Sequence, residues 1–269
     1  VETDEGLYGW GEASLGTQEK AVEGCVADLK RVVVGRNPLE IEKMWFEVYR
    51  DCYWKGGPVF LSALSGIEIA MWDITGKYFN TPVYGLLGGK MRDRVVMYAN
   101  AWFTGAKKPE EFAQKARETV ALGIRALKWD PFGKAHMTLT RGEMDDAVAC
   151  VAAVREAAGP HTELLIECHG RFNPYTAIEI SKELAPFKPM FMEEPVVPDN
   201  MDSLARVREH SLVPVAAGER FYSKYHFWDA LHKGAIDIAQ PDVFHTGGMM
   251  ESKKIAAMCE ACHIQIGRA

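Results

Sequence analysis

What the sequence lacks excludes several classes of protein. No apolar run approaches the roughly 20 residues of a membrane-spanning helix, and the opening stretch VETDEGLYGWGE lacks the basic-then-apolar order of a secretion signal. Positive charge is not in excess, because 37 Asp and Glu against 31 Lys and Arg give a net charge of -6. We therefore expect a cytoplasmic protein that binds small molecules, with no membrane and no nucleic acid among its partners.

Cysteine is also sparse, with six residues in a chain of 269. This spacing is unlike the dense framework of a small disulfide-stapled protein, so free thiols are expected. Cys259 and Cys262 form a C-x-x-C pair, but no second pair completes a zinc site. The apolar spacing around them indicates instead the end of a helix that faces a core.

Two sequence patterns divide the chain near residue 92. Residues 1–92 are expected to form an α+β capping domain, with a strand, a turn at residues 4–6, a returning strand, and helices over residues 18–34, 38–53 and 59–78. After GLLGGKMRDR, short apolar runs alternate with helical segments. This alternation predicts a (β/α) domain over residues 93–269.

The second pattern predicts seven strands, and their ends bear charge. The strand-like runs are VVMYANAW, RALKWDP, LLIECHG, PMFMEEP, VPVAAGE, IDIAQPD and IQIG, with helices expected over residues 109–122, 141–158, 175–184, 201–210, 224–232 and 249–262. Such alternation fits either a barrel or a doubly wound parallel sheet. Charged residues at the same end of five consecutive runs favour the barrel, whose strand ends surround one mouth, and no Gly-rich dinucleotide fingerprint supports the alternative.

Three acids occupy equivalent places in this pattern, one strand–helix unit apart: Glu167, Glu193 and Glu219. Carboxylates that converge repel one another unless a cation neutralises them. An all-oxygen ligand set with room for water suits magnesium, with manganese as an alternative. The pattern therefore predicts a Mg²⁺ site, whereas Glu194 is expected to face elsewhere in an ion pair.

The stretch LLIECHGRFN ends its apolar run in an acid and a histidine two residues apart. Side chains alternate between the faces of a strand, so Glu167 and His169 are expected to point the same way. One face of this strand end would then be polar and reactive. A strand that has merely reached solvent is the alternative reading.

Together these residues produce a family resemblance. The series ALKWDPFG, LLIECHGRF, MFMEEP, PVAAGER and IAQPDVFHTGG resembles the mandelate racemase branch of the enolase superfamily, and most of all its galactonate- and gluconate-type sugar-acid dehydratases. The resemblance implies a modified TIM-type (β/α) barrel under a capping domain, with flanking strands expected beyond both ends of this sequence. It also implies that Mg²⁺, bound by the three acids, holds a substrate carboxylate and stabilises the enediolate left by α-proton removal.

The resemblance further implies roles for the residues around the acids. Dehydration requires a general acid beside the leaving hydroxyl, and His169 is predicted to be that acid. Lys128 matches a family lysine and is expected to bind the substrate carboxylate or to form a structural ion pair. Asp130 stands where racemases have a second, basic lysine, which argues against two-base racemisation. Asp130 and Arg171 are candidate substrate contacts.

The base that removes the α-proton is not assigned by the sequence. Asp242 matches the acid that orients a catalytic histidine on the seventh strand, but Ala269 stands where that histidine is expected. His245 is an alternative base and a candidate substrate contact. Trp54, in the stretch CYWKGGPV, lies in a segment that resembles the family's specificity loop.

Three functions remain open at this point. The first is a Mg²⁺-dependent lyase that converts an aldonate to a 2-keto-3-deoxy acid. The second is a racemase or epimerase of a carboxylate on the same scaffold. The third is a catalytically silent relative that binds an acid sugar, which Ala269 suggests. The implied partners are a small-molecule sugar acid and further copies of the same chain.

Overall fold

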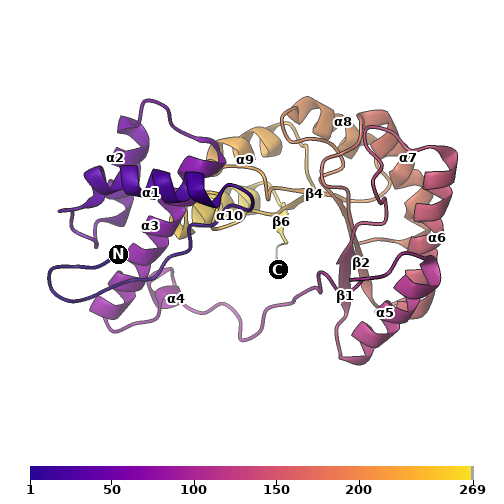
Figure 1. Cartoon of the computed structure of the whole chain (residues 1–269), viewed down its shortest axis with the longest axis horizontal. Coiled ribbons are helices and arrows are strands. Elements are labelled where there is room, and N and C mark those ends of the chain that lie inside the picture. The colour runs from indigo at the N-terminus through magenta and orange to yellow at the C-terminus, as the bar shows by residue number, and fades with distance from the viewer. Residues whose placement is uncertain (268–269) are drawn as a thin grey trace. The chain divides into compact units, whose positions relative to one another are not determined.

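The structure is a computed structural model that describes residues 1–267 (Figure 1). It divides into two compact units. Unit 1 comprises residues 1–95, 219–228 and 241–262. Unit 2 comprises residues 96–218, 229–240 and the stretch from residue 263 onward.

Unit 1 is helical. Its helices are α1 (Glu19–Val33), α2 (Ile41–Asp51), α3 (Gly57–Tyr78), α4 (Val83–Leu86) and α10 (Met249–Ala261), and α9 (Ser223–His232) begins in it. The helices expected over residues 18–34, 38–53, 59–78 and 249–262 are confirmed, with ends displaced by a few residues. The short α4 was not expected. All six cysteines are free thiols, as expected.

Helix α3 forms the core of unit 1. Leu61, Leu64 and Met71 pack with Val22 of α1 and Trp45 of α2 in one buried cluster. Of the helices in the described residues, α3 alone is long and apolar enough to cross a membrane, but 83% of the relevant window is buried. The expectation that no apolar stretch reaches this length was therefore wrong. Neighbours on all sides explain why α3 is apolar around its circumference.

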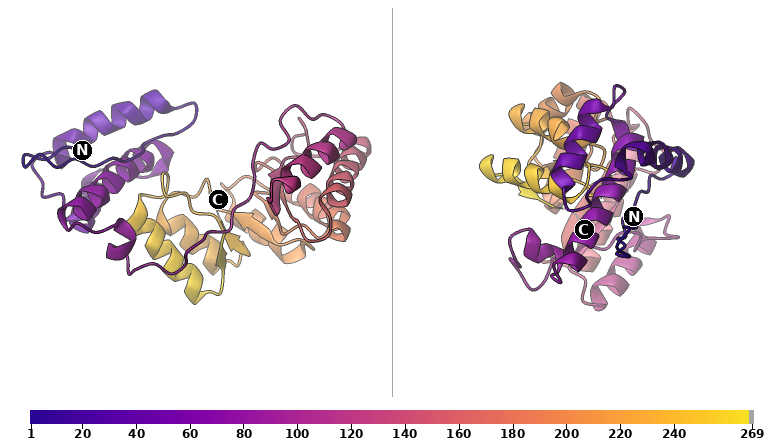
Figure 2. Two further views of the ribbon diagram at one scale, coloured as in Figure 1. Left: turned by 90° about the horizontal axis from the view of Figure 1, so that it is seen from below. Right: turned by 90° about the vertical axis from the view of Figure 1, so that its left-hand side faces the viewer.

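The N-terminal segment packs along α3 (Figure 2), and its two arms pair only briefly around the expected turn at residues 4–6, without forming full strands. Only a single antiparallel bridge, between Glu2 and Tyr8, forms there. A Cβ atom at Gly9 would lie 1.9 Å from the Ala70 carbonyl oxygen, and one at Gly11 would lie 1.9 Å from that of Gly66. The two glycines therefore allow the backbone to contact the helix directly, which no larger residue would permit.

Unit 2 contains a parallel sheet. In the described residues its six strands are β1 (Ala126–Trp129), β2 (Glu163–Glu167), β3 (Phe191–Glu193), β4 (Val215–Ala217), β5 (Ile238–Ala239) and β6 (Gln265–Ile266). They lie side by side in chain order. A doubly wound sheet would reverse its order at a switch point, so the sequential order confirms the barrel-like α/β fold. The expected strand VVMYANAW contributes only a parallel bridge between Ala99 and Leu127.

Helices connect these strands and flank one side of the sheet (Figure 1). They are α5 (Pro109–Ala121), α6 (Arg141–Ala158), α7 (Pro174–Leu184) and α8 (Met201–His210), each close to its expected range, and a 3₁₀ turn, η1 (Ala185–Phe187), follows α7. Thr140 and Glu143 form a reciprocal capping box at the start of α6. On the other sheet face, one side chain from each of five strands enters a buried layer: Ala126, Leu165, Phe191, Ala216 and Ile238.

A buried acid links α3 to α10 inside unit 1. The two carboxylate oxygens of Glu68 accept hydrogen bonds from the Met249 and Met250 N–H groups, at 2.8 and 2.9 Å, and one also accepts from Trp72 Nε1 at 2.7 Å. A negative charge at a helix N-terminus is stabilised by these N–H groups and by the helix dipole. Burial nevertheless raises the pKa of Glu68 to about 7, with the charge of Glu251 assisting and the three hydrogen bonds opposing.

This shift makes the stability of the chain depend on pH. The folded chain holds the Glu68 proton more tightly than the unfolded chain, whose pKa is near 4.5. The free energy of unfolding therefore falls as pH rises from 4.5 to about 7, on the order of 3 kcal/mol for this group alone. We predict that Glu68→Gln removes this fall, measured by urea denaturation at several pH values across the interval.

Glu260, an exposed residue of α10, supplies the matched control. Glu260→Gln should keep the pH slope of the parent protein. An unchanged slope in the Glu68→Gln protein would contradict the prediction.

Candidate functional site

The site follows from the alternation of side chains along the strands. Residues two positions beyond the buried layer point to the same face of the sheet. Those positions hold Lys128 on β1, Glu167 at the end of β2, Glu193 at the end of β3, Gly218 after β4 and Gln240 after β5. An apolar layer is thus followed by a layer that contains charged and polar side chains.

Glu167 and Glu193 are direct neighbours in the parallel register of β2 and β3. Both are buried, with 3% and 1% of their surface exposed. Lys128, also buried, places its Nζ atom 2.7 Å from Glu167 Oε2 and 2.6 Å from Glu193 Oε2. One ammonium therefore bridges two carboxylates, and the formal charge of the group is negative.

The surroundings alter the pKa values of this group in ways that follow from the geometry. Burial raises the pKa of Glu193, and the neighbouring Glu167 charge adds to this, while Lys128 opposes both. Burial by itself lowers the pKa of Lys128, but the charges of Glu193 and Glu167 more than reverse the effect, so its pKa lies above the ordinary value. The amine stays protonated at neutral pH.

The donors in this layer fit a hard cation. Both Glu193 oxygens are buried and accept no hydrogen bond of good geometry from any described residue, although Oε2 lies beside Lys128. The amide atoms of Gln240 are likewise buried without such a bond, and that amide is near enough to Glu193 to lower its pKa. Buried oxygens that lack a hydrogen bond of good geometry can accept a further partner, and carboxylate oxygens are ligands that Mg²⁺ prefers.

The third expected ligand, Glu219, follows β4 by two residues and belongs to unit 1. Within residues 1–267 no group of three His, Cys, Asp or Glu side chains is already arranged around a metal position. That Glu219 joins Glu167 and Glu193 at a cation stays a prediction. Glu194 is buried and has a left-handed backbone with φ 41°.

His169 reaches the site for a different reason than the one expected. Strand β2 ends at Glu167, and His169 has a left-handed backbone with φ 51°, so strand alternation does not extend to it. Instead, the His169 N–H donates to Glu167 Oε1 at 2.7 Å. The ring Nδ1 atom lies 2.7 Å from Asp130 Oδ2, and 56% of the side chain is exposed. The sharp turn brings histidine and acid together.

The environment of His169 favours its protonated form. The hydrogen bond to Asp130 raises the pKa of the imidazole above its ordinary value of 6.5, with partial burial opposing and the Glu167 charge assisting. An imidazolium that is partly exposed can donate a proton to a bound molecule. This is what a general acid beside the acid pair requires.

Asp130 and Arg171 contact each other in the structure. Arg171 Nη2 donates to both Asp130 oxygens, at 2.7 and 2.6 Å. Lys128, Asp130, Glu167, His169 and Arg171 therefore form one connected network at the ends of β1 and β2. The predicted contacts of Asp130 and Arg171 with substrate stay predictions.

The remaining candidates lie in unit 1. Asp242 is buried and accepts from the Phe244 N–H at 2.9 Å. His245 places Nδ1 2.9 Å from Ser62 Oγ and Nε2 3.8 Å from Asp242 Oδ2. Trp54 is 86% exposed beside Tyr53, and Ala269 lies outside the described residues. The roles proposed for these residues stay predictions.

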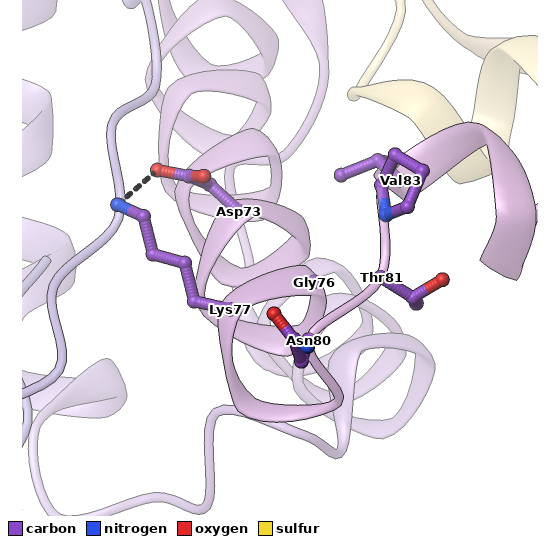
Figure 3. A pocket seen from close by; sticks show the side chains of 7 residues that line it. Asp73, Gly76, Lys77, Asn80, Thr81 and Val83 are labelled. Atoms are coloured by element: carbon purple, nitrogen blue, oxygen red, sulfur yellow. Dashed lines mark hydrogen bonds and ion pairs between the residues drawn. The ribbon is translucent and has the colours of Figure 1, made fainter.

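A hollow of about 330 Å³ at the end of α3 offers no comparable chemistry (Figure 3). Its charged pair, Asp73 and Lys77, is 2.9 Å apart. The same side chains accept from the Trp10 N–H and donate to the Tyr8 carbonyl. They therefore hold the N-terminal segment in place.

Sequence reasoning missed Gln240. It follows β5, two residues beyond the buried layer, as Glu167 and Glu193 are on their own strands. The alternation of side chains along the strand could therefore have indicated it. The predicted site rests on charged residues at the strand ends, whereas the side chain of Gln240 is a neutral amide. Gly218 has φ 145°, and a Cβ atom there would lie 2.8 Å from the Gln240 nitrogen. Because glycine has no side chain, position 218 leaves room for the backbone of Gln240.

Two family models match most of the chain. The model described as "Enolase C-terminal domain-like" matches residues 111–267. The model described as "Mandelate racemase / muconate lactonizing enzyme, N-terminal domain" matches residues 1–88.

The chain also resembles individual proteins. It is 40% identical to the D-gluconate dehydratase of Thermoproteus tenax, over 99% of this chain and 54% of that protein. It is 38% identical to the D-galactonate dehydratase of Ralstonia pickettii, over 99% of this chain and 69% of that protein. The chain thus spans about half the length of the first relative.

The chain also resembles solved structures. A member of the enolase superfamily from Salmonella Typhimurium superimposes with a TM-score of 0.95 at 31% identity, over 100% of this chain and 75% of that one. A mandelate racemase/muconate lactonizing enzyme-like protein from Rubrobacter xylanophilus gives 0.88 at 34% identity, over 96% and 72%.

The bridging role of Lys128 can be tested without an activity assay. We predict that Lys128→Met lowers the free energy of unfolding by about 3–5 kcal/mol in EDTA, because it leaves two buried carboxylates without a counter-charge. Added Mg²⁺ should recover more stability in this variant than in the parent protein. Thermal and urea denaturation with and without the metal measure both effects.

Lys182→Met is the control, because within the described residues Lys182 forms its ion pair with Glu179 on the exposed face of α7. It should leave both stability and the effect of Mg²⁺ nearly unchanged. Equal stability of the Lys128→Met and parent proteins in EDTA would show that the bridge does not stabilise the fold.

Proposed function

The chain belongs to the mandelate racemase/muconate lactonizing enzyme family of the enolase superfamily, and from this premise we propose that it is a magnesium-dependent hydro-lyase that dehydrates sugar acids. The observation that supports this most directly is the juxtaposition of a buried acid pair with an exposed histidine. Glu167 and Glu193 would hold the cation, and His169, bonded to Glu167 through its backbone, stands beside them.

The reaction removes a proton next to a carboxylate and a hydroxyl from the following carbon. Such a proton is very weakly acidic, so its removal needs stabilisation of the charge that develops on the carboxylate. A bound Mg²⁺ supplies this stabilisation as a Lewis acid. Glu167 and Glu193 would hold the cation, and burial of the pair shields their oxygens from water.

His169 supplies the second requirement. Hydroxide is a poor leaving group, so a proton must reach the departing oxygen. The His169 imidazolium donates its Nε2 proton, the C–O bond breaks with both electrons going to oxygen, and water leaves. The resulting enol tautomerises to a 2-keto-3-deoxy acid. The residue that takes the α-proton remains unassigned.

The geometry favours dehydration over two-base racemisation. A racemase of this type would need a basic group where Asp130 stands, but Asp130 is an acid bound to Arg171 and His169. We further propose that the substrate is a sugar acid of the gluconate or galactonate type, that the reaction takes place in the cytoplasm, and that the protein is a homo-oligomer. The names of its relatives support the substrate class.

A panel of aldonates with Mg²⁺ tests the proposed activity. The protein, with any sequence that flanks residues 1–269, should form a keto acid from one or a few of them. We predict that His169→Asn lowers kcat by roughly 10²–10⁴-fold, as expected for loss of a general acid. Glu193→Gln should abolish turnover and weaken Mg²⁺ binding measured by calorimetry.

The control is His161→Asn, because His161 is exposed just before β2, at the end opposite Glu167. This variant should retain full activity. Exchange of the α-hydrogen with deuterium but no keto acid would indicate a racemase. Metal-dependent ligand binding without either reaction would indicate a relative that only binds.

A further inference from the structure

We propose that Asp130 is the positioning residue of the proton donor: it holds the His169 ring with Nδ1 protonated, so that Nε2 faces the substrate. The effect of this role on catalysis rests on the proposed function. The contact itself can be tested without turnover. It differs from the role expected from the sequence, in which Asp130 contacts the substrate.

The carboxylate of Asp130 is already occupied by the chain's own groups. Oδ2 lies 2.7 Å from His169 Nδ1 and also accepts from Arg171 Nη2 at 2.6 Å. Oδ1 accepts from Arg171 at 2.7 Å and from the Phe132 N–H at 2.9 Å. These bonds fix the carboxylate on both oxygens and leave it little capacity for a substrate hydroxyl.

Arg171 is fixed in turn by the backbone. Nε donates to the Cys168 carbonyl at 3.1 Å and Nη1 donates to the Gly133 carbonyl at 2.8 Å. The guanidinium therefore cannot swing toward a ligand without losing these bonds. Its charge compensates the Asp130 carboxylate, so that Asp130 acts as an acceptor for His169.

His169 is held at two points. Its N–H is bonded to Glu167 Oε1, which fixes the backbone, and its Nδ1 is bonded to Asp130, which fixes the ring. Asp130 follows β1 and His169 follows β2, and these strands are neighbours in the sheet. Because Nδ1 is occupied, Nε2 is the ring nitrogen that remains for a bound molecule.

The tautomer matters for the proton transfer. The imidazolium gives its Nε2 proton to the leaving hydroxyl oxygen, and the neutral ring that remains has its proton on Nδ1, bonded to Asp130. Without Asp130 the neutral ring would favour the other tautomer and other orientations. Binding of substrate would be little affected, whereas the transfer step would slow.

The first measurement is ¹⁵N NMR of protein labelled at histidine, without metal or substrate, at a pH where the imidazole is neutral. His169→Asn identifies the His169 signals. We predict protonated Nδ1 and unprotonated Nε2 in the parent protein, and a shift toward the Nε2–H tautomer in Asp130→Asn. A parent ring with its proton on Nε2, or a variant with unchanged signals, would overturn the proposal.

Asp237→Asn is the matched control. Asp237 also accepts from an arginine, Arg208, and from a backbone N–H, that of Val215, but within residues 1–267 it forms no hydrogen bond with a histidine. This variant should leave the His169 signals unchanged. It separates loss of an Asp–Arg pair from loss of the Asp–His contact.

The second measurement is steady-state kinetics on whichever aldonate is turned over. Asp130→Asn should lower kcat by roughly 10²-fold or more with KM changed only a few-fold, and Asp130→Glu should recover part of kcat. A rise in KM with kcat unchanged would show that Asp130 contacts the substrate, and would overturn the positioning role. Absence of turnover in the parent protein would overturn the proposed function, while the NMR result would still decide the contact.

Discussion

The parallel register of β2 and β3 places two acids side by side in the interior of unit 2. Glu167 and Glu193 each end their strand, and the register pairs them directly. Two carboxylates in a buried site repel each other and cannot both stay charged without a cation. Lys128, on the neighbouring strand β1, supplies one positive charge for two negative ones. The excess negative charge leaves this site suited to a divalent cation.

Unit 1 contains another buried acid, Glu68, whose carboxylate is stabilised in a different way. Among residues 1–267 no cationic side chain forms an ion pair with Glu68, and its carboxylate accepts hydrogen bonds from N–H groups at the start of α10 and from Trp72. All of its hydrogen-bonding partners are fixed backbone or ring groups, so little room remains for a ligand. The two acids differ in how their oxygens are satisfied: Glu68 accepts three hydrogen bonds, whereas both oxygens of Glu193 lack hydrogen bonds of good geometry from the described residues.

The sequence predicted those parts of the fold that depend on local periodicity. Helices α6 and α8 begin and end where the alternation of apolar runs and helical segments indicated, and the in-phase acids correctly favoured a barrel. Features that depend on tertiary contact were not predicted. The segment from Gly9 to Gly11 reads as a strand but packs on α3. His169 was associated with Glu167 by strand alternation, whereas a left-handed turn and a backbone hydrogen bond create the contact. The Asp130 contact crosses 39 residues of sequence, so no local pattern encodes it.

The charged side chains at the strand ends differ in exposure, and each exposure suits a different role. A group that transfers a proton to a bound substrate must be reachable, whereas a group that fixes a cation benefits from a dry environment in which electrostatic attraction is strong. Glu193 is almost fully buried and Lys128 nearly so, which suits them to hold charge in place. His169 is more than half exposed at the same strand ends, because its left-handed turn directs the chain out of the sheet. The turn that ends β2 therefore does more than terminate a strand, since it lets Glu167 be buried while His169, two residues later, is accessible.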